Sequence, residues 1–172
     1  TNGILLEKYA PALKEAGLHR VNISMDTMDP LRYRQITRNG DIEQVLRGID
    51  AARNAGLVPI KINCVVKQSS NEPDAQAVKE FCQRENLKVR FIHEMNLEKG
   101  QFSVVEGGDG GHCATCNRMR ITANGDLKPC LFTDLSYNVR TMGIAEAYMA
   151  AIANKPARGS INHKNQFSNI GG

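Results

Sequence analysis

The fold is decided by the stretch AGLVPIKINCVV, residues 55–66. Ala55-Gly56-Leu57 is typical of a helix that ends, because glycine readily takes the backbone conformation that closes a helix. The apolar, β-branched residues from Pro59 to Val66 then predict a strand. The same junction occurs earlier as Ala16-Gly17-Leu18, and a second apolar run follows it at residues 21–25. A helix, a short turn and a strand therefore form a unit that the chain repeats.

Outward from this stretch, the periodicity of apolar residues predicts more of the same elements. Asp29-Pro30 is a typical helix start, with Asp as the cap and Pro in the first turn. Three such helix–strand units predict a parallel sheet with crossover helices, and they are too few to close an eight-stranded barrel of about 200 residues or more. We therefore expect an α/β fold with a partial barrel over residues 1–98. The expected helices contain residues 5–13, 42–49 and 74–86, and the third strand spans residues 87–92.

The rest of the chain has a different character. The run EGGDGG at residues 106–111 predicts a glycine-rich linker over residues 99–111. A small C-terminal domain over residues 112–172 is expected to follow. It should contain a hairpin at Asn124-Gly125, a helix over residues 144–154 and a polar tail that ends in Gly171-Gly172.

Three of the five cysteines form a cluster of possible metal ligands. Cys113 and Cys116 form a C-x2-C motif, and Cys130 follows after thirteen residues. Thiolates suit iron–sulfur clusters and zinc. A structural zinc site usually has four protein ligands, and His112 is the only nearby fourth candidate. Three cysteines on a four-iron cluster would leave one iron open, so the spacing favours an iron–sulfur cluster and leaves zinc as the alternative.

Two arginines stand next to this cluster. Arg118 and Arg120 are two residues apart, so on a strand they project to the same face and could hold phosphate or carboxylate oxygens as a fork. A two-residue turn at Asn124-Gly125 predicts that Cys130 lies opposite Met119. In a regular ladder this register would turn Cys130 away from the arginines.

Composition limits the partners and the location. The 172 residues carry a net charge of +4 and 5% aromatic residues, without tryptophan. A mild positive charge suits a small polyanion such as a nucleotide, whereas few aromatics argue against a nucleic-acid-binding module stabilised by zinc. The odd cysteine number argues against a disulfide framework. No apolar run reaches the length of a membrane span, and the N-terminus does not resemble a signal peptide, so we expect a cytoplasmic protein without membrane or nucleic-acid partners.

Together these motifs resemble a known family. The pattern Cys113-x2-Cys116-Asn117-Arg118-x-Arg120, the stretch GDLKPCLF at residues 125–132 and the final Gly171-Gly172 are similar to the C-terminal half of the molybdenum-cofactor biosynthesis protein A family. These proteins are the radical S-adenosylmethionine (SAM) GTP 3′,8-cyclases. The stretches VNISMD at residues 21–26 and PIKIN at residues 59–63 agree as well. The resemblance implies a partial radical SAM barrel followed by an iron–sulfur domain.

The resemblance also implies a function and site roles. The family cyclises GTP to (8S)-3′,8-cyclo-7,8-dihydroguanosine 5′-triphosphate, and this chain would supply the auxiliary cluster and the GTP site. The implied ligands of an auxiliary 4Fe-4S cluster are Cys113, Cys116 and Cys130, and the implied GTP contacts are Lys61, Arg118, Met119 and Arg120. Ser24 and Met95 would contact SAM, and Gly171 and Gly172 would form a tail that reaches into the active site.

The sequence departs from the family in its cysteines. The C-x3-C-x2-C motif of the family's radical-generating cluster is absent, because no cysteine precedes Cys64. We therefore expect these 172 residues alone to be inactive, and to need a separate N-terminal half or to associate with a second copy through an open sheet edge. An inactive relative that acts as a scaffold is a further alternative. Cys64 and Cys82 are expected to be small core residues.

Overall fold

The computed structural model describes residues 1–165 and contains two separate sheets. Contacts divide the chain into two units. The first unit contains Thr1–Glu94 and Val105–Gly108, and the second contains Met95–Val104 and the described residues from Asp109 onward. The segment predicted as a linker, residues 99–111, therefore contributes to both units.

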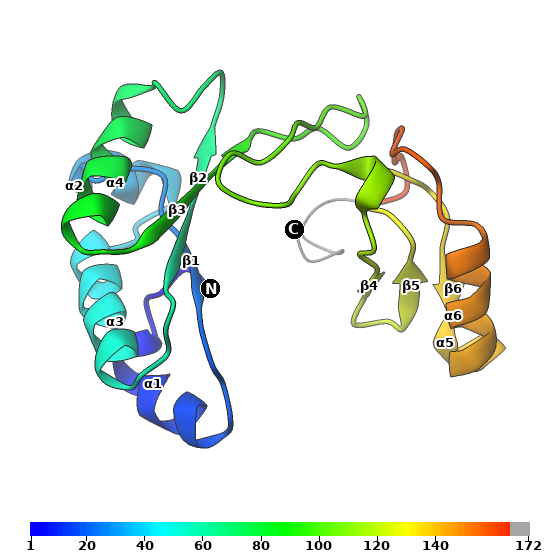
Figure 1. Cartoon of the computed structure of the whole chain (residues 1–172), viewed down its shortest axis with the longest axis horizontal. Coiled ribbons are helices and arrows are strands. Elements are labelled where there is room, and N and C mark those ends of the chain that lie inside the picture. The colour runs from blue at the N-terminus through cyan, green and yellow to red at the C-terminus, as the bar shows by residue number, and fades with distance from the viewer. Residues whose placement is uncertain (166–172) are drawn as a thin grey trace. The chain divides into compact units, whose positions relative to one another are not determined.

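A parallel sheet forms the centre of the first unit, and all four helices of this unit cover one of its faces (Figure 1). The strand order is β1-β2-β3, as expected for successive crossover units. This arrangement confirms the predicted α/β fold with a parallel sheet. The strands are β1 (Asn22–Ser24), β2 (Lys61–Val66) and β3 (Lys88–His93), and the helices are α1 (Leu6–Glu15), α2 (Pro30–Ile36), α3 (Ile42–Asn54) and α4 (Pro73–Arg84).

The predicted helix boundaries have their expected physical causes. Asp29 caps α2, because its carboxylate accepts hydrogen bonds from the backbone N–H groups of Leu31 and Arg32 at 2.8 and 3.0 Å. After α1 and α3 the chain turns at Gly17 and Gly56, whose φ angles of 92° and 73° lie in the left-handed region. The repeated Ala-Gly-Leu junction therefore directs each helix into the next strand.

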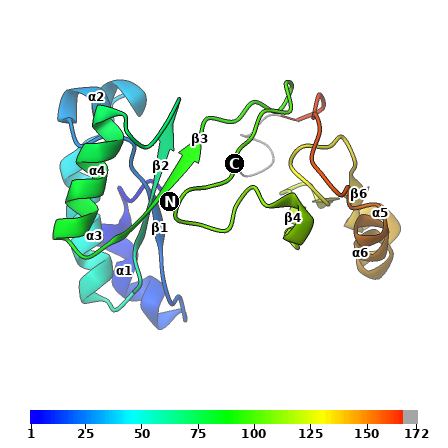
Figure 2. The same ribbon diagram turned by 45° about the horizontal axis from the view of Figure 1, so that its top comes forward.

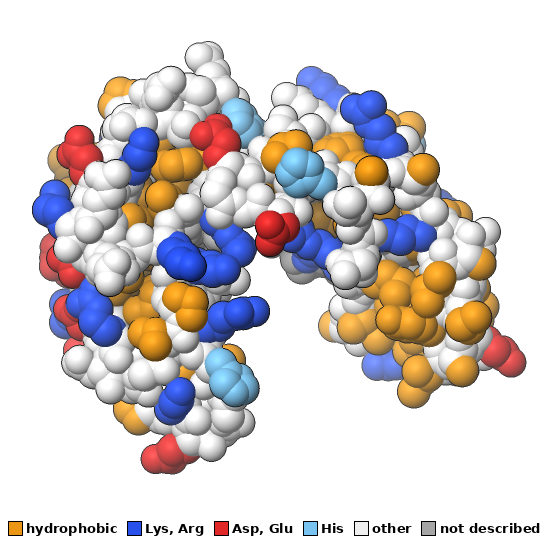
Figure 3. Space-filling view, in the orientation of Figure 1, with side chains coloured by type: hydrophobic (Ala, Val, Ile, Leu, Met, Phe, Trp, Pro, Cys, Tyr) orange, Lys and Arg blue, Asp and Glu red, His pale blue; other side chains and the backbone are white. Residues whose placement is uncertain are grey.

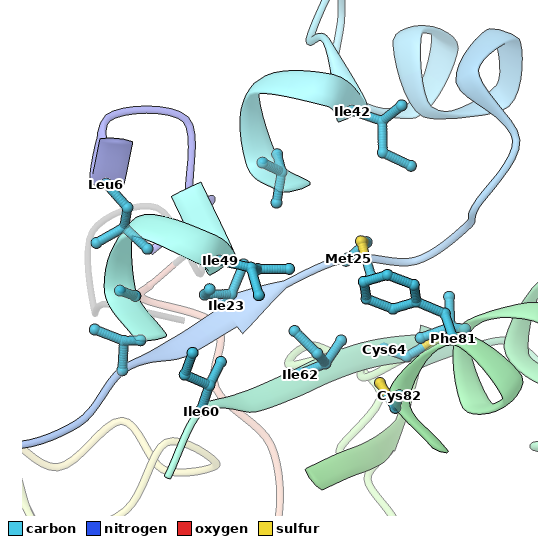
Figure 4. Close-up of a cluster of buried hydrophobic side chains, with 14 of the residues drawn as sticks. Leu6, Ile23, Met25, Ile42, Ile49, Ile60, Ile62, Cys64, Phe81 and Cys82 are labelled. Atoms are coloured by element: carbon cyan, nitrogen blue, oxygen red, sulfur yellow. The ribbon is translucent and has the colours of Figure 1, made fainter. Parts of the chain in front are cut away.

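The core of the first unit lies between the sheet and the helices (Figure 4). Ile23 and Ile62 are fully buried on the covered face of neighbouring strands, and Val45 and Ile49 of α3 are buried in the same cluster. Cys64 and Cys82 belong to this core too, as the sequence predicts. Burial raises the pKa of the Cys64 thiol to about 12 and that of Cys82 to about 11, so both stay protonated and serve as apolar groups.

The second unit is built on a small antiparallel sheet (Figure 2). The predicted helix at residues 144–154 is confirmed, whereas the third strand and the short helix before it were not predicted. Ala147 and Ala151 of that longer helix are fully buried, while its larger residues, including Ile144 and Met149, lie exposed in an apolar area (Figure 3). The elements are a 3₁₀ turn η1 (Cys113–Thr115), β4 (Arg120–Ile121), β5 (Asp126–Lys128), β6 (Tyr137–Asn138), α5 (Val139–Met142) and α6 (Ile144–Ala153).

The register of the hairpin differs from the predicted one. Arg120 pairs with Lys128, so extending the ladder places Cys130 opposite Arg118, and the predicted position opposite Met119 is wrong. The cause is a three-residue loop in place of a two-residue turn. The N–H of Gly125 bonds the carbonyl of Thr122 at 2.9 Å, and Gly125 has a φ of 87°, which is the geometry of a type I turn followed by a left-handed residue. The one-residue shift brings Cys130 to the same face as the arginines.

Polar side chains supply much of the packing in the second unit. Leu97 and Phe132 form a small apolar cluster, with the Phe102 ring centroid 4.5 Å from that of Phe132. Asn162 is fully buried and donates to the carbonyl of Leu131 at 2.7 Å. Lys128 is also buried, and its ammonium donates to the carbonyl of Leu135 at 3.3 Å. Across residues 1–165, no helix is both long and apolar enough to cross a membrane.

The loop geometry gives a first prediction. Gly125→Ala should destabilise the second unit by roughly 1–2 kcal/mol, because a side chain disfavours the left-handed conformation. An added Cβ would also stand 3.3 Å from Val139 Cγ2 and Arg140 Nε. Hydrogen exchange of the β4 and β5 amides measures this local stability. Asn124→Ala is the control, because Asn124 has no positive φ, and equal exchange in both variants would contradict the three-residue loop.

Candidate functional site

Local geometry brings the first two cysteines together. Cys113 begins the 3₁₀ turn η1, and the N–H of Cys116 donates to the carbonyl of Cys113 at 3.1 Å. Residues three apart on a 3₁₀ turn lie above one another, so the two side chains share one side of the turn. Both thiols are half-buried. The C-x2-C motif therefore forms a local pair of ligands.

The third cysteine reaches this pair through the hairpin. Cys130 lies two residues after β5 ends, and it interacts electrostatically with both Cys113 and Cys116. Burial is the main cause that raises the pKa of the Cys130 thiol, while a hydrogen bond from the N–H of Phe132 and the positive charge of Lys155 favour its thiolate. Cys130 of one segment thus lies within electrostatic range of the two cysteines of another segment of the second unit.

The backbone at Gly159 packs closely against Cys130. A Cβ added to Gly159 would stand 3.3 Å from the Cys130 sulfur and 2.7 Å from Phe132 Cβ, so the backbone passes close to the thiol here. Within residues 1–165, no three His, Cys, Asp or Glu side chains are arranged to hold a single metal ion. His112, the fourth ligand considered for zinc, is exposed. The spacing of the three cysteines is what favours an iron–sulfur cluster over zinc, and the metal of the site stays a prediction.

Of the two predicted arginines, Arg120 begins the strand β4 and Arg118 precedes it. Arg120 is half-buried in β4, and Arg118, two residues earlier, is exposed. Desolvation, and next the positive charge of Arg118, lower the pKa of Arg120. Burial and a neighbouring like charge thus both disfavour the charged form of Arg120, and the positive charges of Arg118 and Arg120 act on each other. Met119, between them, is half-buried.

A second group of polar residues lines the uncovered face of the first unit's sheet. Side chains alternate between the two faces of a strand, so the residues between the buried ones point away from the helices. Ser24, exposed at the end of β1, pairs with Asn63, and Lys61 pairs with Asn22 on one side and Lys88 on the other. Lys and Arg side chains gather over these strands in Figure 3. Ser24 and Lys61 thus share one sheet face, as their predicted roles require.

Two residues of this face were not assigned a role from the sequence. Asn63 and Arg90 are paired in the register of β2 and β3. The Asn63 Oδ1 and Arg90 Nε atoms are buried without a hydrogen-bond partner, which is costly unless a ligand satisfies them. The available signal was the alternation of polar and apolar residues, because strands covered on both faces are apolar throughout.

Other predicted site residues lie elsewhere. Met95 belongs to the second unit, where it packs against the cluster of Leu97 and Phe132. Gly171 and Gly172 lie outside the described residues, so their predicted role as an active-site tail stays a prediction.

A pocket at the carboxyl edge of the first unit's sheet was also not predicted. Its lining includes Asp26, Arg32, Asp74 and Glu94. In this pocket, the Asp74 carboxylate forms an ion pair with Arg32 at 2.6 Å and accepts a hydrogen bond from the Thr27 hydroxyl at 2.7 Å. Burial raises the pKa of Asp26, which accepts a hydrogen bond from the N–H of Val65. Among the described residues, two of the buried atoms without a hydrogen-bond partner, Asn63 Oδ1 and Arg90 Nε, lie on the sheet face, and the third, the Tyr33 hydroxyl oxygen, belongs to α2.

Two family models match the chain, and their ranges overlap at residues 64–82. The family model described as radical SAM superfamily matches residues 1–82, and the model described as molybdenum cofactor synthesis C matches residues 64–166. The first match contains the parallel sheet up to α4, and the second contains the cysteine cluster and both arginines.

Individual relatives match most of the chain. The GTP 3′,8-cyclase of Petrotoga mobilis is 35% identical over an alignment that covers 100% of this chain and 71% of the relative. The GTP 3′,8-cyclase 1 of Pseudomonas aeruginosa is 34% identical, with coverage of 92% and 65%, and the enzyme of Moorella thermoacetica is 36% identical, with coverage of 88% and 62%. The chain thus spans about two thirds of the length of these relatives. It belongs to the GTP 3′,8-cyclase family, the radical SAM proteins of molybdenum-cofactor biosynthesis that its cysteine and arginine motifs resemble.

Proposed function

We propose that this chain supplies the auxiliary 4Fe-4S cluster and the GTP-binding site of a GTP 3′,8-cyclase. One observation carries the proposal: Cys130 interacts electrostatically with Cys113 and Cys116 from a separate segment, and Arg118 and Arg120 follow Cys116 within four residues. Thiolates hold iron, and adjacent guanidiniums hold an anion with several oxygens. The relatives named GTP 3′,8-cyclase supply the reaction class.

The ligand set favours a cluster over a zinc ion. A structural zinc ion usually takes four protein ligands, and the sequence offers three clustered cysteines with only His112 nearby as a fourth. Ligands of a four-iron cluster attach to different irons and stand further apart. Cys113, Cys116 and Cys130 would hold three irons, and the open fourth iron would supply a Lewis-acidic position for the guanine base.

The positive groups would bind the triphosphate. Arg118 and Arg120 would donate paired hydrogen bonds to phosphate oxygens, which also relieves their mutual repulsion. Met119 holds the spacing between them. Lys61 would add a second basic contact, and Ser24 and Met95 would contact SAM. The unsatisfied Oδ1 of Asn63 and Nε of Arg90 support a ligand on the sheet face that carries Ser24 and Lys61.

The alternative functions have less support. A nucleic-acid-binding module stabilised by zinc is not favoured, because the relatives are cyclases. The 172 residues lack the cysteine trio that generates the radical in the family. The part of the chemistry proposed here is therefore substrate binding and orientation.

Metal analysis tests the cluster. Protein prepared without oxygen should bind iron and sulfide in near-equal amounts, and Cys116→Ala or Cys130→Ala should abolish this binding because each removes a ligand. Cys82→Ala is the matched control, since that thiol lies in the core of the first unit. Stoichiometric zinc without sulfide would refute the assignment.

Calorimetry tests the arginine fork. Arg118→Ala or Arg120→Ala should each weaken GTP binding by roughly 1.5–3 kcal/mol, the range for a hydrogen bond to a charged group. Lysine at either position should restore only part of the affinity, because it lacks the planar fork. Arg84→Ala, at an exposed position on α4, should leave binding unchanged. Equal affinity in the wild type and the double alanine variant would rule the fork out.

A turnover assay tests the division of labour. Residues 1–172 incubated without oxygen with SAM, a strong reductant and GTP should release no 5′-deoxyadenosine, because they contain no radical-generating cysteine trio. A separately expressed N-terminal half that carries C-x3-C-x2-C should restore product if the two parts dock. Chromatography detects the product, and its release by this chain alone would disprove the expectation.

A further inference from the structure

One lysine connects the two segments that carry the cysteines. The Lys155 ammonium donates to the carbonyl of Arg118 at 2.7 Å and to the carbonyl of Pro129 at 2.5 Å. Arg118 lies two residues after Cys116, and Pro129 directly precedes Cys130. Both carbonyl oxygens bind one nitrogen, so Lys155 sets the distance between the segments at the point where their β-ladder has ended.

The β4–β5 ladder does not extend to Arg118 and Pro129. Its pairs run from Arg120 with Lys128 towards the turn, and proline at position 129 has no N–H to donate to the neighbouring strand. The carbonyls of Arg118 and Pro129 need other donors, and an ammonium has three N–H groups that can serve both. A neutral side chain with one donor could not bridge them equally.

The backbone around Lys155 is fixed by helix α6 and by the proline that follows it. Lys155 follows the C-terminus of α6, and its N–H bonds the carbonyl of Ile152 at 3.1 Å. Helix α6 is anchored through Ala147 and Ala151, which are fully buried. Proline at position 156 restricts the backbone directly after it. The side chain is therefore half-buried and directed by a packed helix.

We propose that Lys155 is a positioning residue for the cysteine cluster. It fixes the segment of Cys116 and Arg118 against the segment of Cys130, and it places a positive charge beside thiolates that are negative when they bind iron. The inference rests on the proposed iron–sulfur site. Lys155 would not bind iron itself and would act by positioning the segments that carry the cysteines. Residues that orient metal ligands in this way change metal affinity about 10–100-fold when replaced.

Cluster retention tests this role without measuring turnover. In protein loaded with iron and sulfide, Lys155→Met should lose the cluster to a chelator about 10–100 times faster than the wild type, as followed by visible absorbance and bound iron. Lys155→Arg should retain most of the stability, because it keeps the charge and several donors, whereas Lys155→Gln should not. Lys99→Met, exposed in the same unit, is the matched control.

The outcomes separate this inference from the proposed function. A wild type that binds no iron refutes the cluster and this role with it. If the wild type binds iron and all three Lys155 variants release it at the wild-type rate, only the positioning role is wrong. If Lys155→Met does not fold, the comparison of the Arg and Gln variants decides, and equal retention by both overturns the proposal.

Discussion

The second unit depends on hydrogen bonds from buried polar side chains to backbone carbonyls. Its buried apolar residues within the described part are few: Leu97, Leu127, Pro129, Phe132, Ala147 and Ala151. So small a core cannot by itself fix a chain with short strands. Lys128, Lys155 and Asn162 instead donate to carbonyls of neighbouring segments. Each such bond satisfies a carbonyl that a longer sheet would have paired, and together they set the position of Cys130.

The first unit has a parallel sheet with one apolar, covered face and one polar face. Its strands bury one face against four helices and keep polar side chains on the other, although a parallel sheet is usually covered on both faces. Lys61, Asn63 and Arg90 lie on the uncovered face, so their side chains do not pack in the hydrophobic core. Two of these residues have polar atoms that are buried and unsatisfied. Such costs are typical of a surface that is completed by a ligand or by more protein.

Local patterns were enough for the first unit, and they were not enough for the second. The repeated Ala-Gly-Leu junctions and the Asp29 cap act within a few residues, so the sequence predicts the helices and strands well. The register of the hairpin was wrong because the left-handed Gly125 can close a two-residue or a three-residue loop, and the Thr122 carbonyl decides between them. Lys155 could not be found at all, since it meets Arg118 across 37 positions of the chain.

The repulsion between Arg118 and Arg120 has an evolutionary consequence. Under the proposed function, anion binding is what retains two neighbouring like charges, so the pair is a point of electrostatic frustration. Selection for thermal stability alone would then act on one of the two arginines before it changed the core. A thermostabilised descendant of this chain would be expected to lose the proposed anion site first, while its fold remained intact.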